Sequence, residues 1–293
     1  MHYKKGIGER VFDICNYIFL ALLVVVTIYP CYYILIASIS DPVEIAASNG
    51  MMLLPKKPAF YSYSEVLKSS QIWVGYRNTI LYVVLGGLLS VALTVSAAYG
   101  LTRKNLPGQR IMTLMMLFTM YFSGGLIPNY LVVRGLGITD TVLAMILPQA
   151  IVTTNLIITI SYFKGMPLSI DEAARIDGAN DYTIMLKIMT PLAKPIIAVI
   201  SLYYMVSIWN NYFSALIYIN ERSLYPLQLV LREILLQNNT NSISAGVSAD
   251  DAAAYAENVK YATIVVSTVP VLCIYPFLQK YFVKGVMIGS VKG

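Results

Sequence analysis

The side chains with the clearest potential for polar chemistry gather in residues 169–195, SIDEAARIDGANDYTIMLKIMTPLAKP. The segment lies between two long uncharged apolar runs, and its carboxylates are Asp171, Glu172, Asp177 and Asp181. Ser169 and Glu172 have the spacing of a capping box, which predicts a helix that begins near Ile170. A carboxylate in the first turn of a helix can cap that helix and can also pair with a cation on a partner protein.

Other residue patterns that would support chemistry are missing from the sequence. There is no G-x-x-x-x-G-K-[ST] phosphate-binding loop, so we expect no binding and hydrolysis of ATP by this chain alone. There is no HExxH motif and no Cys/His cluster, and His2 is the only histidine. The cysteines are odd in number and lie in apolar runs, which makes a disulfide framework or a metal site a poor interpretation of Cys15, Cys31 and Cys273. We therefore predict no catalytic residue and no metal ligand.

The 169–195 segment is predicted to form two short helices. Ala173 and Ala174 keep one surface of the first piece small, which would allow close approach by another protein. Gly178 is expected to interrupt or cap this helix, and a second piece, DYTIMLKIM, runs to Pro191. A bent pair of helices suits insertion into a groove on a partner. The alternative is an amphipathic interfacial helix that only anchors the loop.

The composition indicates what surrounds this segment. The 293 residues are 57% hydrophobic and 12% charged, and the mean hydropathy is +0.66. Soluble domains carry roughly 25% charged residues, so the chain is predicted to be an all-α polytopic membrane protein. Its net charge of +6 could suggest nucleic acid as a partner. The positive residues lie beside apolar runs, however, so the positive-inside rule explains them better and no nucleic acid partner is expected.

Six apolar stretches are long enough to cross a bilayer, which requires roughly 20 residues, and none contains Asp, Glu, Lys, Arg or His. The predicted spans are about 14–40, 78–102, 111–133, 141–163, 195–220 and 261–279. With the N-terminus inside, the inner segments hold 13 of the 21 Lys and Arg residues. Both termini and the 165–194 loop are therefore predicted to be cytoplasmic. No linker or repeat divides the chain, so a single membrane domain over 1–293 is expected.

The absence of ionisable residues from the spans bears on the source of energy. Carriers driven by protons or sodium ions usually keep ionisable groups near the middle of the membrane. Their absence here weighs against a stand-alone secondary transporter or facilitator, which remains the alternative to a complex powered by another protein. A membrane-embedded scaffold is a third possibility.

Polar and aromatic residues in the fifth predicted span could line a transport path. Sugars are bound by aromatic faces and amides, and this span has both in Trp209, Asn210, Asn211 and Tyr212. Asn155 in the fourth span is a further candidate with less support. Hydrogen bonding between helices and an aromatic belt at the membrane interface are the preferred alternatives for these residues. The outer loops, 41–76 and 221–260, contain three positive residues that could attract an acidic sugar: Lys56, Lys57 and Arg222. The simpler interpretation is that they are solvated loop charges.

The 165–194 loop resembles the EAA loop of ABC importer permeases (EAA-x3-G-x9-I-x-L-P). The matching residues are Glu172, Ala173, Ala174, Gly178, Ile188 and Pro191, and Asp177 adds a feature of the carbohydrate importers. Thr190 departs from the pattern because Leu is usual there. YRNTILY (76–82), YFSGGLIPNYLVVRGLGITDT (121–141), WNNY (209–212) and the ending KGVMIGSVKG are similar to the oligosaccharide branch of the family, as in the maltose importer. Permeases for oligouronides derived from alginate and pectin look most similar.

This resemblance implies an assembly. It implies an inner-membrane permease subunit that forms the path with a second, different permease. It also implies an extracytoplasmic solute-binding protein that delivers an oligosaccharide, with an acidic one such as alginate as the narrower expectation. A dimer of ATPase subunits would bind ATP and Mg²⁺ and dock on the loop through Glu172, Ala173, Ala174, Asp177, Gly178 and Pro191. The chain itself would need no cofactor.

Overall fold

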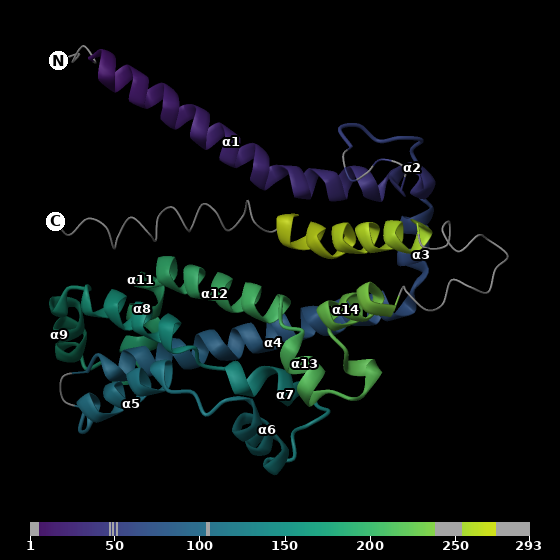
Figure 1. The fold of residues 1–293 in the computed structure, drawn as a ribbon. Coiled ribbons are helices and arrows are strands. Elements are labelled where there is room, and N and C mark those ends of the chain that lie inside the picture. The colour runs from purple at the N-terminus through teal and green to yellow at the C-terminus, as the bar shows by residue number, and fades with distance from the viewer. Residues whose placement is uncertain are drawn as a thin grey trace. The chain divides into compact units, whose positions relative to one another are not determined.

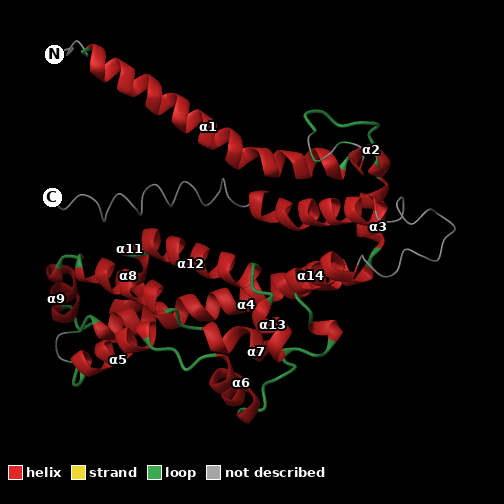
Figure 2. Cartoon of the chain, in the orientation of Figure 1, coloured by secondary structure: helices red, strands yellow, loops and turns green. Residues whose placement is uncertain are grey.

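The protein is described by a computed structural model that covers residues 6–46, 48, 50, 52–103, 106–237 and 254–273. All regular secondary structure in these ranges is helical (Figure 2). The predicted all-helical membrane fold is thus confirmed at that level. The chain divides into two compact units, Met1–Ser69 with Glu233–Val269, and Ser70–Arg232 with Pro270–Gly293. Each is described by itself.

The first unit is organised around a buried asparagine. Its helices are α1 (Ile7–Ser38), α2 (Pro42–Ala46), α3 (Tyr61–Lys68) and a helix over 254–273. Asn258, only 2% exposed, donates from Nδ2 to the carbonyl oxygens of Ala37 at 2.7 Å and Ser40 at 3.1 Å. Its Oδ1 accepts a hydrogen bond from Ser62. Since a buried amide is costly unless it is paired, this side chain fixes the end of α1 against two other helices.

The second unit contains the remaining helices, except that the end of α14 from Glu233 onward belongs to the first unit (Figure 1). They are α4 (Ser70–Leu101), α5 (Gln109–Tyr121), α6 (Leu126–Gly135), α7 (Val142–Ile146), η1 (Leu147–Gln149), α8 (Thr153–Lys164), α9 (Leu168–Ile176), α10 (Asp181–Thr183), η2 (Ile184–Met189), α11 (Thr190–Leu192), α12 (Lys194–Trp209), α13 (Phe213–Tyr218), η3 (Arg222–Leu224) and α14 (Leu227–Gln237). α4, α8 and α12 pack against one another. The core between them includes Val95, Leu156 and Ile200.

Close packing in this unit depends on two glycines of α4. A Cβ on Gly75 would lie 3.0 Å from the backbone Cα of Leu227, and one on Gly86 would lie 3.0 Å from Cδ1 of Ile208. Small residues at such positions let the helices of a membrane protein approach each other closely. A buried polar contact completes the core: the Tyr204 hydroxyl lies 2.7 Å from Oγ1 of Thr94 and accepts from the backbone N–H of Val152 at 3.0 Å.

The described helices correspond only partly to the six predicted spans. By length and composition, α1 and α4 could each cross a membrane. Three bent pairs could each form a broken span or a re-entrant loop: Gln109–Tyr121 with Leu126–Gly135 (119°), Val142–Gln149 with Thr153–Lys164 (51°), and Asp181–Leu192 with Lys194–Trp209 (83°). The described residues thus offer up to five spans. The sixth predicted span, 261–279, begins in the helix over 254–273 and extends outside the described residues.

Within the predicted span over 195–220, the helix is interrupted at the WNNY segment. α12 ends at Trp209 and α13 begins at Phe213. Asn210 donates from its side chain to the carbonyl of Val206 at 2.9 Å, and Asn211 accepts from the N–H of Ser214 at 3.0 Å. Asparagine side chains compete in this way with helical hydrogen bonding. The two amides therefore end one helix and cap the next.

Candidate functional site

The first half of the 165–194 loop is α9, and its N-terminus differs from the prediction. The helix begins at Leu168, its N-cap is Pro167, and no side chain caps it by a hydrogen bond. The predicted capping box between Ser169 and Glu172 is therefore wrong. Pro167 already has an extended backbone and leads directly into the helix, so Ser169 lies inside the first turn. Glu172 is exposed and remains available to a partner.

Gly178 ends α9 in the manner that the sequence predicts. Its φ is +81°, in the left-handed region that favours glycine. The N–H of Gly178 donates to the carbonyl of Arg175 at 3.0 Å, and that of Ala179 donates to the carbonyl of Ala174 at 2.9 Å. These two bonds form a Schellman motif. A Cβ at Gly178 would meet nothing within 4 Å, so within this chain only the backbone conformation requires glycine.

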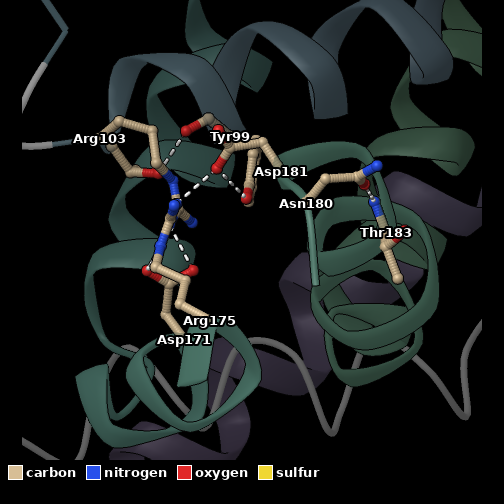
Figure 3. Close-up of polar contacts among 8 residues, drawn as sticks. Tyr99, Arg103, Asp171, Arg175, Asn180, Asp181 and Thr183 are labelled. Atoms are coloured by element: carbon tan, nitrogen blue, oxygen red, sulfur yellow. Dashed lines mark hydrogen bonds and ion pairs between the residues drawn. The ribbon is translucent and has the colours of Figure 1, made fainter. Parts of the chain in front are cut away.

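The second half of the loop is a continuous helical stretch from Asp181 to Leu192. Asn180 caps it by accepting from the N–H of Thr183 at 2.8 Å (Figure 3). The stretch widens to a π-helix over Ile184–Met189. Pro191 follows and has no N–H to donate to the preceding turn, while Thr190, the departure from the family pattern, donates from Oγ1 to the carbonyl of Met185 at 2.7 Å.

Some side chains of the loop pack inward and others leave a free surface. Ala174 and Ile184 are buried, at 6% and 0% exposure, in the core that contains Val95 and Tyr99. Ala174 therefore serves close packing within this chain, whereas Ala173 is exposed. The exposed surface combines carboxylates with apolar side chains and consists of Glu172, Ala173, Ile176, Asp177, Gly178, Tyr182, Leu186 and Pro191. We call this set the docking face.

Five side chains join the loop to the end of α4 (Figure 3). Asp171 pairs with Arg103 at 2.5 Å and with Arg175 at 3.1 Å, and Arg175 pairs in turn with Asp181. The Tyr99 hydroxyl donates to Asp181 at 3.4 Å, and the Arg103 guanidinium lies 3.9 Å from the centre of the Tyr99 ring. These contacts close a ring, which we call the loop brace.

The brace changes the titration of Asp171. Partial burial on its own raises the pKa of this carboxyl, but hydrogen bonds from Arg103 and Arg175 and their positive charges outweigh it and leave the pKa below its ordinary value. Asp171 is therefore ionised at neutral pH. Sequence reasoning missed the roles of Tyr99 and Arg103. The i, i+4 spacing of Asp171 and Arg175 was the one local signal, because such pairs lie on the same helix face.

The residues proposed to line a transport path occupy different environments. Asn155 and Trp209 are buried, at 5% and 8% exposure, and the Trp209 ring lies 6.4 Å from that of Tyr76. Asn210 and Tyr212 are exposed. Arg232 lies 5.9 Å from the Tyr212 ring. The two Asn side chains of WNNY bond to their own helix termini, so the hydrogen bonding between helices that we preferred for them is not the arrangement found.

The sequence is similar to those of several known proteins. Residues 72–288 match the family model for the inner membrane component of binding-protein-dependent transport systems. Protein LplC of Bacillus subtilis is 39% identical over 293 residues, which cover 100% of this chain and 98% of the relative. The polygalacturonan/rhamnogalacturonan transport system permease protein YtcP of the same organism is 38% identical over 290 residues, with 97% and 99% covered.

A solved structure is also similar. It is the crystal structure of a bacterial ABC transporter involved in the import of the acidic polysaccharide alginate. One of its chains superposes with a TM-score of 0.86 at 34% sequence identity, covering 96% of this chain and 99% of that chain. The similarity therefore extends over the full fold and is not confined to the 165–194 loop.

Proposed function

The chain belongs to the inner membrane components of binding-protein-dependent transport systems, and we propose that it passes movement from partner ATPase subunits to a path for oligosaccharides. It is a multi-pass permease and a non-catalytic transport subunit. The family implies an ATPase and a binding protein as further components. We place ATP and Mg²⁺ on the ATPase dimer and the path between this chain and a second, different permease. This assignment replaces the alternative of a stand-alone secondary transporter.

The docking face is the observation that carries the proposal. It combines exposed carboxylates with large apolar side chains, Ile176 at 86% and Tyr182 at 75% exposure. Large exposed apolar side chains in a segment that also carries exposed charges are typical of a protein interaction site. The bend at Gly178 offers two short helix surfaces at once, which suits a groove on a partner. Glu172 can pair there with a cation of the ATPase.

We assign the cargo as an oligosaccharide or a fragment of a polysaccharide. Support comes from the names of the relatives: one is a permease for polygalacturonan and rhamnogalacturonan, another transports arabinooligosaccharides, and the similar structure imports alginate. Polygalacturonan, rhamnogalacturonan and alginate all contain uronic acids, which favours an acidic cargo. Trp209 and Tyr212 are our candidates for contact with its sugar rings, together with the amides of Asn155, Asn210 and Asn211.

The full topology is part of the proposal. We assign six spans, both termini in the cytoplasm, and one transmembrane domain over 1–293. The Lys and Arg distribution supports the orientation. The relative that aligns with 100% of this chain supports a single domain.

Reconstitution of the complete importer with its binding protein tests this function. ATP hydrolysis should rise when the binding protein is loaded with a transported sugar, and a panel of neutral and acidic oligosaccharides should identify that sugar. Glu172→Ala should lower the stimulated rate, and Glu221→Ala, which removes the same charge on the opposite side of the predicted membrane, should leave it unchanged. Uptake by this chain alone, driven by a proton or sodium gradient, would contradict the proposal.

A further inference from the structure

The loop brace links the end of α4 to two neighbouring helices, α9 and α10, whose bracing residues lie 68 to 82 positions further along the chain. Tyr99 lies in the last turn of α4 and Arg103 follows that helix, Asp171 and Arg175 lie in α9, and Asp181 begins α10. The chain path alone connects the loop to α8 before it and to α12 after it. Side chains add a third connection, to α4: the polar contacts of the brace, and the packing of Ala174 and Ile184 in the core that contains Val95 and Tyr99.

We propose that Arg103 is a positioning residue that makes the 165–194 loop and the end of α4 move as one body. The inference rests on the proposed function, since it assumes that an ATPase docks on the loop. Movement of the docked ATPase would then reach α4 directly as well as α12. Because α4 packs against both α8 and α12, this connection would transmit the movement to the centre of the helix bundle.

The chemistry of Arg103 supports this role. Its side chain is 21% exposed, as is that of Asp171, so both charges are largely withdrawn from solvent. Its Nε is buried and has no hydrogen-bond partner among the described residues. The guanidinium is held between the Tyr99 ring and the Asp171 carboxylate. A charge in such a place is stabilised by its partner, and removal of the partner leaves it uncompensated.

The position of the bend gives the brace a second task. Gly178 separates α9 from α10, and a glycine hinge on its own would let the two helices move independently. Arg175 and Asp181 pair across this bend, and Tyr99 contacts Asp181 from α4. Both halves of the loop are thus held to the same helix end. The docking face does not include these side chains, so docking and transmission can be separated by mutation.

The experiment compares ATPase retention with transport in the complete reconstituted importer. Arg103→Gln should leave co-purification of the ATPase unchanged but lower sugar uptake per ATP hydrolysed by about fivefold or more, the low end of usual coupling between sites. Arg110→Gln is the matched control, since Arg110 is an exposed arginine in the first turn of α5. It should behave as wild type.

A conservative substitution separates positioning from simple loss of folding. Arg103→Asp should be at least as impaired as Arg103→Gln, whereas Arg103→Lys, which keeps the positive charge beside Asp171, should retain more uptake per ATP than Arg103→Gln. Wild-type uptake per ATP in Arg103→Gln would overturn the inference, and so would equal loss in Arg103→Lys and Arg103→Gln. A failure of the proposed docking would be seen differently: the ATPase would still co-purify with the Gly178→Asp variant.

Discussion

Gly178 offers the sharpest test of the docking face, because the structure separates two effects of substituting it. Its φ of +81° requires a left-handed backbone, and a Cβ there would contact nothing within 4 Å in this chain. Alanine therefore introduces backbone strain of about 1–2 kcal/mol without any internal clash. Asparagine and aspartate tolerate the left-handed region better, but each adds a polar side chain to the space that a partner would occupy.

The two effects predict different orders among three variants. If the bend alone matters, Gly178→Ala should be the most impaired, with the bent conformation reduced by about tenfold for each 1.4 kcal/mol. If a partner fills this space, Gly178→Asp should be the most impaired, although its backbone strain is lower. We expect the second order, with Asp worse than Asn because of its added charge beside Asp177. We also expect Gly178→Asp to be worse than Glu172→Ala.

The assay is co-purification of the ATPase together with ATP turnover stimulated by the loaded binding protein. Hydrogen exchange over residues 176–183 reports separately on the bend. Gly137→Asp is the matched control, because Gly137 also has a positive φ, +67°, and open space around a Cβ, but lies on the opposite side of the predicted membrane. Retention and turnover at the wild-type level in Gly178→Asp would refute docking and leave only an interfacial anchor.

Three further predictions concern packing, pH and topology. Gly75→Ala should lower the thermal stability of the purified permease, because its Cβ would lie 3.0 Å from the Leu227 backbone, whereas Gly100→Ala, with nothing within 4 Å, should not. The loop of the wild-type protein should be better protected from hydrogen exchange than the loop of Asp171→Asn. This difference should be complete above pH 3.8 and should be lost as the pH falls below 3.8, because the folded-state pKa of the Asp171 carboxyl lies below that value. A single cysteine at position 175 should not react with impermeant thiol reagents added outside intact cells. If it were labelled from outside, the predicted orientation of the chain in the membrane would be wrong.

The sequence predicted features that depend on local chemistry. The bend at Gly178 follows from the requirement of a helix end for a left-handed residue, and the two-part loop follows from its spacing. The apolar runs predicted helices at α1 and α4 because length and hydropathy alone determine them. The capping box was wrong because Pro167, which the pattern ignores, already starts the helix two residues earlier than the motif would.

Features that depend on distant residues could not be predicted in the same way. The partners of Arg103 lie 68 positions away for Asp171 and 4 positions away for Tyr99, and only the fold brings the first of these close. The positive-inside rule explained the positive charge of Arg103 but could not predict which residues its side chain contacts. Likewise, the Tyr204 hydroxyl reaches Thr94, 110 positions away, and nothing in the local sequence distinguishes it from a residue of the aromatic belt.

The breaks in the predicted spans bear on what surrounds this chain in the membrane. Helix pairs are bent at 122–125, near 150–152 and at Ala193, and α12 is separated from α13 at 210–212. Residues at two of these sites, Gly124, Gly125 and Asn210, are exposed in the isolated chain. Non-helical backbone at membrane depth is tolerated only where protein or a water-filled cavity faces it. If FSGG and WNNY lie at that depth, lipid cannot be their surroundings. A second permease and an aqueous sugar path would provide both kinds of cover, so the interruptions that spoil the simple span pattern are the features that an importer of two permeases requires.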